Sequence, residues 1–265
     1  MGDLLNRMTG QEKTAQLRAM WTEVKFDTAF FNDSRLINDK LGTGMGFIHA
    51  NYANISQTVE MRNRIQRYLL EKSRLGIPAI FVDEGLHGLL KPEATSFPQA
   101  IGLACSWDIK LFEKVFSVTA NEMRSRGGQL ALTPVIDICR DPRWGRCEEI
   151  YGEDPYLNGM LGTTAVIGFQ ESNTGVIDNN HVAATLKHFT GHGQSESGQN
   201  GGPANYPERI LRESHMLPFE MVIQQANPAA LMPAYVEIDG IPCHANPWLL
   251  NKVLRDKWNF KGLFL

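Results

Sequence analysis

Polar side chains that could bind a ligand stand at the ends of several apolar runs in the sequence. The run at 182–189 carries Lys187 and His188 near its end, before the chain breaks into glycine. A short apolar run without helical periodicity predicts a buried parallel strand. The other residues that follow predicted strands in this way are Asp83, Arg146 and Tyr235. Because functional groups gather at the carboxyl ends of parallel strands, we expect these side chains to share one site.

The chemistry of this set suits a ligand with many hydroxyl groups. A carboxylate such as Asp83 only accepts hydrogen bonds, Arg146 and Lys187 only donate them, and His188 can do either. Charge-assisted hydrogen bonds are about twice as strong as neutral ones, so the set could hold a sugar ring firmly. Each residue taken alone more often has a structural role. Their joint position at several strand ends is what indicates a sugar-binding site.

Histidines that are close in sequence raise the alternative of a metal site. His181, His188 and His192 lie near one another in the chain, but His181 precedes the predicted strand and His188 ends it. The two side chains are therefore expected at opposite ends of the strand, which argues against zinc. The glycine-rich segment at 42–49 lacks the Lys-Ser/Thr pair of a phosphate-binding loop. We expect neither a metal nor a cofactor.

Composition and charge narrow the class of partner. The chain has 265 residues, 43% of them hydrophobic, and a formal net charge of -3. It therefore lacks the basic surface field that attracts nucleic acid or anionic lipid. No apolar run reaches the roughly 18 residues that span a bilayer, and the first residues lack the pattern of a secretory signal. We expect a soluble chain that binds a neutral small molecule and neither nucleic acid nor a membrane.

Predicted strands and helices alternate along the chain. Strands are expected at 42–49, 77–82, 129–138, 182–189, 229–235 and 260–265, and helices at 10–19, 56–74, 107–126, 155–169, 207–226 and 247–258. Thr9 and Glu12 form a capping box at the first helix, and Ser106 and Asp154 are expected to cap two others. This alternation is typical of parallel βα units. We count about six units where a closed (β/α)8 barrel has about eight, so we expect an α/β fold, an incomplete TIM-type barrel that is part of a longer protein.

The sequence contains four cysteines and does not decide whether any of them form a disulfide. Cys105 and Cys243 stand alone in apolar sequence and are expected to be buried free thiols. Cys139 and Cys147 flank the segment RDPRWGR, where two free thiols and a disulfide are alternatives. A disulfide would indicate an oxidising compartment.

Several longer segments make the sequence resemble the amino-terminal barrel domain of glycoside hydrolase family 3, the β-glucosidase and β-xylosidase family. These segments are MTGQEKTAQL at 8–17, DEGLHG at 83–88, CRDPRWGRCEEIYGEDPYL at 139–157, LKHFTGHG at 186–193, MPAYVEIDGIPCHAN at 232–246 and WNFKGLFL at 258–265. They follow the family's order over nearly the whole chain, which makes the match far more specific than any single motif. The resemblance implies that residues 1–265 are part of one catalytic barrel domain, with later domains outside this chain.

The resemblance also implies roles for individual residues. Asp83, Arg146, Lys187 and His188 would bind hydroxyl groups of the sugar in the cleavage subsite, and Tyr235 would lie beside the nucleophile. Family members continue past the segment that matches FKGLFL into Ser-Asp-Trp or a close variant, whose aspartate is the nucleophile. That residue is therefore expected just after Leu265, and the general acid in a later domain. Cys139 and Cys147 match positions that are bridged in some members.

The activity that the resemblance implies is that of a retaining exo-β-glycosidase. Such an enzyme would release terminal β-D-glucosyl or xylosyl residues from a β-glucoside, a β-xyloside or an oligosaccharide. A retaining enzyme needs two carboxyl groups about 5 to 5.5 Å apart, and we expect neither in this chain, which would be inactive alone. The resemblance is compatible with a periplasmic or secreted location.

Two alternative functions stay open. One is a non-catalytic sugar-binding module that uses the same residues. The other is a β-N-acetylhexosaminidase, whose relatives carry an Asp-His pair in the loop after the Lys-His pair. That loop here contains His192 and Glu196 but no Asp-x-His, which argues against the second alternative.

Overall fold

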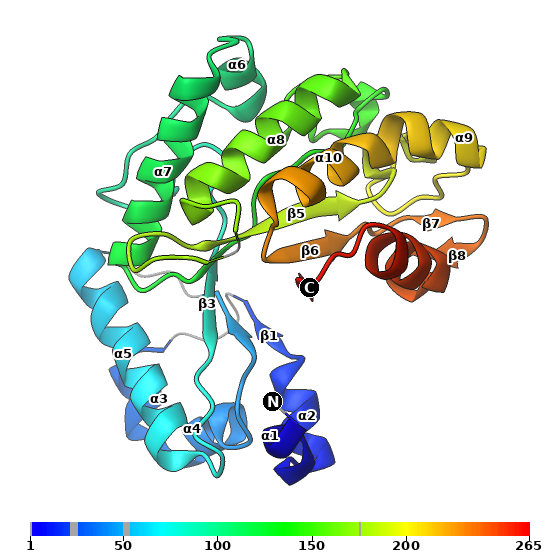
Figure 1. The fold of residues 1–265 in the computed structure, drawn as a ribbon. Coiled ribbons are helices and arrows are strands. Elements are labelled where there is room, and N and C mark those ends of the chain that lie inside the picture. Colours follow the sequence, from blue (N-terminus) through cyan, green and yellow to red (C-terminus); the bar gives the residue numbers. More distant parts are fainter. Residues whose placement is uncertain (1, 22–25, 50–53, 175) are drawn as a thin grey trace. The chain divides into compact units, whose positions relative to one another are not determined.

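The computed structural model describes residues 2–21, 26–49, 54–174 and 176–265. These residues form parallel strands that alternate with helices, which confirms the predicted α/β class (Figure 1). The chain divides into two compact units. The first comprises Met1–Asp83, Lys91–Glu93 and Ser125–Leu130, and the second comprises Glu84–Leu90, Ala94–Arg124 and Ala131–Leu265.

The first unit is built on short parallel strands, in which β2 pairs with both β1 and β3. Its elements are α1 (Gly2–Arg7), α2 (Gly10–Gln16), β1 (Ala19–Met20), α3 (Thr28–Asn32), α4 (Ser34–Leu41), β2 (Phe47–Ile48), α5 (Ile55–Lys72) and β3 (Ile80–Asp83). The capping box is confirmed, because Thr9 Oγ1 accepts a hydrogen bond from the Glu12 amide and the Glu12 carboxylate accepts one from the Thr9 amide. Phe26, Ile48 and Phe81 pack together in the core of this unit.

The second unit holds the longer strand β5 and the helices that cover it. Its elements, with β4 at the division between the units, are α6 (Ala100–Ala104), α7 (Ile109–Ser125), β4 (Leu130–Ala131), η1 (Pro142–Trp144), η2 (Cys147–Glu149), α8 (Pro155–Gln170), β5 (Ala183–Phe189), η3 (His192–Gln194), η4 (Glu196–Gly198), α9 (Glu208–Ile210), η5 (Leu211–Met216), α10 (Leu217–Ala226), β6 (Ala230–Pro233), β7 (Glu237–Ile238), β8 (Ile241–Pro242), η6 (Cys243–Ala245), η7 (Trp248–Lys257) and β9 (Leu263–Phe264). β6 pairs in parallel with β5 and with β9. β7 and β8 form a separate antiparallel hairpin.

β5 is buried because it has backbone partners on both sides and helices over it. The amide groups of Thr185 and Lys187 donate to the carbonyl groups of Thr133 and Pro134, and the opposite edge pairs with β6. The helices α7, α8 and α10 lie side by side along these strands (Figure 1), and α8 packs against both α10 and β5. Apolar side chains fill the space between strands and helices, so the end of β5 is held rigidly.

Most predicted elements are confirmed in type, but their ends differ. The helix predicted at 10–19 ends at Gln16, because Ala19 and Met20 pair with β2 in a strand that the sequence did not predict. The described residues therefore contain seven alternating strands, β1 to β6 and β9, against about six predicted. Only Leu130–Ala131 of the strand predicted at 129–138 is regular, and Pro134 in this segment has no amide to donate.

Two predicted helices contain π-helical turns. The helix predicted at 207–226 is α9, the π-helical segment η5 and α10 in succession, and the helix predicted at 247–258 is the π-helical η7. Pro218 lacks the amide that would continue the α-helical hydrogen bonds where η5 passes into α10, which accounts for a change of register there. Among the helices in the described part of the chain, none is long and apolar enough to cross a membrane.

Candidate functional site

Lys187 and His188 lie at the end of β5, as the sequence predicted, and both are buried. Lys187 Nζ donates a hydrogen bond of 2.9 Å to Glu84 Oε2. The lysine side chain is 5% exposed and the glutamate side chain 38% exposed, so the pair runs from the interior to the surface of the second unit. Glu84 was not among the predicted binding residues, although it follows Asp83 directly.

Arg146 lies in the segment between η1 and η2 and is held by a second acidic residue. Its Nε and Nη2 atoms donate hydrogen bonds of 2.8 Å each to the two carboxylate oxygens of Glu149. Its guanidinium also lies over the Trp144 ring, 5.4 Å from the centroid. Burial alone would raise the pKa of Glu149, but the hydrogen bonds from Arg146 outweigh it and hold that pKa below its usual range. Both partners of the pair are therefore charged.

His188 is a neutral imidazole between a carboxylate and a guanidinium group. Its Nδ1 atom lies 2.8 Å from Asp137 Oδ2, and its Nε2 atom lies 3.4 Å from Arg146 Nη2. Burial lowers the pKa of His188 well below its usual value, and the positive charges of Lys187 and Arg146 lower it further. Burial also raises the pKa of Asp137 to about 6. At neutral pH the histidine is thus uncharged and Asp137 mainly ionised.

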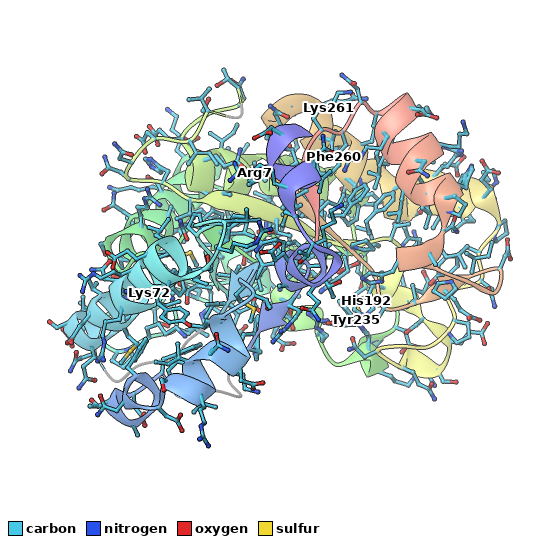
Figure 2. The ribbon with its side chains drawn as sticks, turned by 90° about the horizontal axis from the view of Figure 1, so that it is seen from below. Arg7, Lys72, His192, Tyr235, Phe260 and Lys261 are labelled. Carbon is cyan, nitrogen blue, oxygen red and sulfur yellow. The ribbon has the colours of Figure 1, made fainter. Side chains whose placement is uncertain are left out.

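Tyr235 follows β6 and faces the two histidines of the site. Its ring centroid lies 6.3 Å from that of His188 and 5.7 Å from that of His192. Figure 2 shows Tyr235 and His192 next to each other. Tyr235 is 60% exposed whereas His192 is fully buried, so the tyrosine ring forms the outer part of this cluster.

Asp83 has different surroundings from the other predicted residues. Its Oδ2 atom accepts a hydrogen bond of 2.9 Å from Arg62 Nη2, and both side chains are nearly inaccessible. Its Oδ1 atom lies 3.9 Å from Lys91 Nζ. These three residues belong to the first unit, whereas Arg146, Lys187, His188 and Tyr235 belong to the second. Within the second unit the structure groups Arg146, Lys187, His188 and Tyr235, and within the first unit it gives Asp83 a buried ion pair.

Three acidic residues of the site were not among the binding residues predicted from the sequence. They are Glu84, Asp137 and Glu149, which contact Lys187, His188 and Arg146 respectively. Glu84 and Glu149 stand inside the segments DEGLHG and CRDPRWGRCEEIYGEDPYL, so the signal was present. Which cation each acid contacts depends on the fold, because the paired residues can be as far apart as 103 positions in sequence.

The structure separates the histidines that raised the question of a metal site. His181 contacts Asp178 and Glu171, with Nδ1 2.7 Å from Asp178 Oδ1 and Nε2 3.1 Å from Glu171 Oε2. Asp137, His188 and His192 instead form a buried group whose potential ligand atoms all lie within 4.8 Å of one another. A carboxylate and two imidazoles could hold a transition metal. However, the Nδ1 of His188 already bonds to Asp137, and the guanidinium of Arg146 lies at the other ring nitrogen, Nε2.

The cysteines depart from expectation at one position. Cys105, which directly follows α6, is exposed rather than buried, whereas Cys243 is buried as predicted. Cys139 and Cys147 are thiols whose sulfur atoms lie 2.6 Å apart. Burial, together with the contact to Cys147, raises the pKa of Cys139 to about 12, so this thiol is not ionised at neutral pH. The disulfide stays a prediction.

Comparison with known proteins identifies related chains over the full length. Residues 9–265 match the family model described as the glycosyl hydrolase family 3 N terminal domain. A β-xylosidase of Formosa agariphila is 40% identical over 198 residues, which are 72% of this chain and 27% of that protein. A periplasmic β-glucosidase of Salmonella typhimurium is 33% identical, and the match covers 98% of this chain and 32% of that protein.

Solved structures show the same likeness. A β-glucosidase from Erythrobacter marinus superimposes with a TM-score of 0.90 at 36% identity, over 99% of this chain and 35% of that one. A β-glucosidase from Listeria innocua in complex with glucose has a TM-score of 0.84 at 29% identity, over 99% of this chain and 36% of that one. The likeness confirms the expected fold class, an incomplete (β/α)8-type barrel.

The chain spans about a third of the length of the relatives that it matches. Its own residues nevertheless match the family model almost from end to end. The chain therefore belongs to glycosyl hydrolase family 3 and corresponds to the N-terminal domain of that family.

Proposed function

We propose that the protein to which this chain belongs is a retaining exo-β-glycosidase, a β-glucosidase or β-xylosidase that acts on terminal β-D-glycosyl residues. Within it, residues 1–265 are part of the amino-terminal catalytic barrel domain and carry the groups that bind the terminal sugar. The relatives named above as β-xylosidase and β-glucosidases support the substrate class. The arrangement of charges at the end of β5 is the observation that carries the proposal.

That arrangement offers donors and acceptors in alternation and nearly balances its charges. There are two ion pairs, Glu84–Lys187 and Arg146–Glu149, and the neutral His188 contacts Arg146. Neighbouring hydroxyl groups of a sugar both donate and accept, so such an alternating set matches them without a net charge on the ligand. Because the cations are already fixed by their acids, little side-chain freedom is lost on binding.

Glu84 is a second candidate, beside Asp83, for the carboxylate that binds sugar hydroxyl groups. Asp83 is buried against Arg62, whereas Glu84 contacts Lys187 and is partly exposed. A ligand can therefore reach the Glu84 carboxylate without breaking a buried ion pair. We retain Arg146, Lys187, His188 and Tyr235 as the other residues of this subsite, and test Asp83 alongside Glu84.

Bond cleavage requires groups that we place outside residues 1–265. A retaining glycosidase uses a nucleophile and a general acid about 5 to 5.5 Å apart. The relatives are about three times as long as the matched segment, which leaves ample chain for both groups. We place the nucleophile just after Leu265 and the general acid in a later domain.

A sugar titration of the 15N-labelled chain tests the binding part of this proposal. We expect saturable shifts of the Lys187 and His188 amide signals with glucose or xylose, and much weaker shifts with N-acetylglucosamine. Lys187→Met should abolish these shifts. Lys252→Met, which removes a 74% exposed lysine on η7, should leave them unchanged. Shifts confined to other regions, or equal effects of both variants, would contradict the proposed subsite.

Hydrolysis of an aryl β-glucoside tests the catalytic part. The 265-residue chain should bind sugar without turnover, and a chain extended through the remaining domains should hydrolyse the substrate. Turnover by the short chain would show that both carboxyl groups lie within it. An extended chain that binds glucose but does not hydrolyse the glucoside would instead identify a sugar-binding module.

A further inference from the structure

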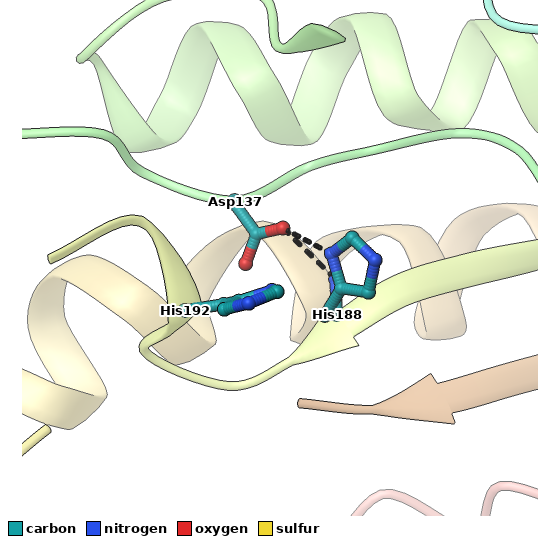
Figure 3. Close-up of side chains that lie close together, drawn as sticks. All are labelled: Asp137, His188 and His192. Carbon is teal, nitrogen blue, oxygen red and sulfur yellow. Dashed lines mark hydrogen bonds and ion pairs between the residues drawn. The ribbon is translucent and has the colours of Figure 1, made fainter. Parts of the chain in front are cut away.

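Asp137 is a buried carboxylate bound twice by the same histidine. Its Oδ2 atom accepts one hydrogen bond from the backbone amide of His188, at 3.1 Å, and one from the ring atom Nδ1, at 2.8 Å (Figure 3). Asp137 and His188 are each 2% exposed. The carboxylate therefore fixes both the backbone and the ring of His188 at the end of β5.

These contacts determine which ring nitrogen carries the proton. A ring nitrogen 2.8 Å from an ionised carboxylate must donate, so Nδ1 carries the hydrogen. The other nitrogen, Nε2, lies 3.4 Å from Arg146 Nη2, and a guanidinium can only donate. Two independent neighbours thus require the same tautomer, with a lone pair on Nε2. Burial keeps the ring neutral, so Nε2 keeps this lone pair at neutral pH. A ligand hydroxyl group would take the place of the long contact from Arg146 Nη2, which also donates to Glu149.

We propose that Asp137 is a positioning residue that holds His188 in the Nδ1–H tautomer, so that Nε2 accepts a hydrogen bond from a ligand hydroxyl group. The identity of that ligand as a sugar rests on the function proposed above. The consequence for recognition is a fixed polarity. Lys187 and Arg146 donate to the ligand, whereas His188 accepts from a hydroxyl group that must itself act as the donor.

His192 stands on the other side of Asp137 and provides the competing interpretation. Its Nε2 atom lies 2.7 Å from the carbonyl oxygen of Asn200 and must donate to it, which leaves the lone pair on Nδ1. The second oxygen of Asp137 is turned toward the His192 ring (Figure 3). Among the described residues, none hydrogen-bonds to Asp137 Oδ1 or to His192 Nδ1. A metal could satisfy both atoms. If it also took Nδ1 of His188 as a ligand, the proton of that ring would move to Nε2, which faces the donor Arg146.

The tautomer can be observed directly by long-range 1H–15N correlation of the 15N-histidine-labelled chain at pH 7. We expect His188 to show a protonated Nδ1 and an unprotonated Nε2, with no sugar present. An Nε2–H tautomer in the unmodified chain would overturn the proposal. So would binding of one equivalent of zinc that shifts the Nδ1 signals of His188 and His192 together. Because no sugar is needed, this result is independent of the proposed function.

Variants at Asp137 connect the tautomer to binding. Asp137→Ala should populate the Nε2–H form of His188 and weaken glucose binding by about tenfold, because a ligand hydroxyl group then meets an N–H group and loses its acceptor. Asp137→Asn can still accept from Nδ1–H through its amide oxygen, so it should keep the tautomer and most of the affinity. This milder variant keeps the test decisive if Asp137→Ala does not fold.

A second Asp–His pair in the same unit serves as the matched control. Asp178 Oδ1 lies 2.7 Å from His181 Nδ1, at a partly exposed position outside the site. Asp178→Ala should alter the His181 signals and leave glucose binding unchanged. An Asp137→Ala chain that folds, keeps the His188 tautomer and still binds glucose less tightly would refute the positioning role.

Discussion

Arg146 donates two parallel hydrogen bonds, each 2.8 Å long, to the carboxylate of Glu149. The pair is only three residues apart in sequence, yet it orients the guanidinium so that Nη2 also reaches His188. A planar guanidinium group that is hydrogen-bonded through two of its nitrogen atoms cannot rotate freely. The position of Arg146 in the site is therefore set by Glu149 rather than by the backbone alone.

Replacing Arg146 by lysine should weaken sugar binding although the charge is kept. A lysine ammonium cannot make the two parallel bonds and is free to move away from His188. We expect the dissociation constant for glucose to rise about tenfold or more, as measured by titration calorimetry.

Arg143→Lys is the control for that substitution. Arg143 makes a similar forked contact with Asp141, through Nε and Nη2, but its side chain is 70% exposed. Its replacement should not change the affinity for glucose. Equal losses in the two variants would mean that the segment 139–149 is disturbed as a whole.

Asp83→Asn and Glu84→Gln should separate stability from binding. Asp83→Asn leaves the buried Arg62 without its anion and should lower the free energy of unfolding by about 3 to 5 kcal/mol. Glu84→Gln leaves Lys187, whose side chain is 5% exposed, without its carboxylate partner, but Glu84 itself is 38% exposed, so we expect a smaller loss than in Asp83→Asn. Urea denaturation measures both effects.

The same two variants rank the carboxylates in sugar binding. We expect Glu84→Gln to weaken glucose binding at temperatures where the variant is folded. Glucose binding could instead be unchanged in Glu84→Gln and weakened in Asp83→Asn at temperatures where that variant is folded. This result would assign the sugar contact to Asp83 alone.

His215 should make the second unit sensitive to acid. Burial lowers the pKa of His215 to about 4, with Arg140 lowering it further and Asp137 opposing the shift. Tyr206 stacks on the ring, and none of the described residues hydrogen-bonds to either ring nitrogen. The His215 side chain is therefore protonated below about pH 6.5 in the unfolded chain, but only below about pH 4 in the folded chain. The free energy of unfolding should fall as the pH falls from 6.5 to 4, by about 3 kcal/mol in total.

His215→Phe should remove this part of the acid sensitivity, and at pH 7 it should not lower stability, because a phenyl ring has no polar atoms to leave unpaired. The pKa of Asp137 is raised to about 6, so this residue makes the free energy of unfolding rise as the pH falls, and it remains in the variant. Urea denaturation at pH 7, 5.5 and 4.5 gives the pH dependence of the free energy of unfolding for the variant and for the unmodified chain. His244→Phe, at an exposed position, is the control. Parallel slopes in His215→Phe and the unmodified chain would show that other groups dominate.

Gly168 should be required for the contact between α7 and α8. A β-carbon at Gly168 would lie 2.6 Å from the carbonyl oxygen of Glu113 and 2.9 Å from Phe116 Cβ. Gly168→Ala should therefore force the two helices apart and destabilise the chain by about 1 to 3 kcal/mol.

Gly102→Ala supplies the matched comparison in α6. A β-carbon there meets only Pro98 Cβ, at 3.9 Å, and the residue is exposed. Alanine is favoured over glycine in a helix by about 1 kcal/mol, so this variant should be as stable as the unmodified chain or more so. A loss in Gly102→Ala equal to that in Gly168→Ala would mean that helix packing is not the cause.

The sequence alone determined the local features of this protein. The alternation of apolar runs and amphipathic segments predicted the α/β class, and the Thr9–Glu12 capping box and the Asp154 cap fixed two helix starts. The segments that carry the family resemblance also stand in the sequence itself. These features depend on neighbours a few residues away, which is why they can be predicted without a fold.

Only the tertiary structure decided which charges meet. Successive residues at a strand end point in different directions, so a step of one position separates Asp83, buried against Arg62, from Glu84, which contacts Lys187. The contact between Asp137 and His188 joins residues 51 positions apart, and no local pattern encodes it. The sequence therefore identified the polar residues that could form a site, and the fold determined their partners, because hydrogen bonds between distant residues depend on how the strands pack.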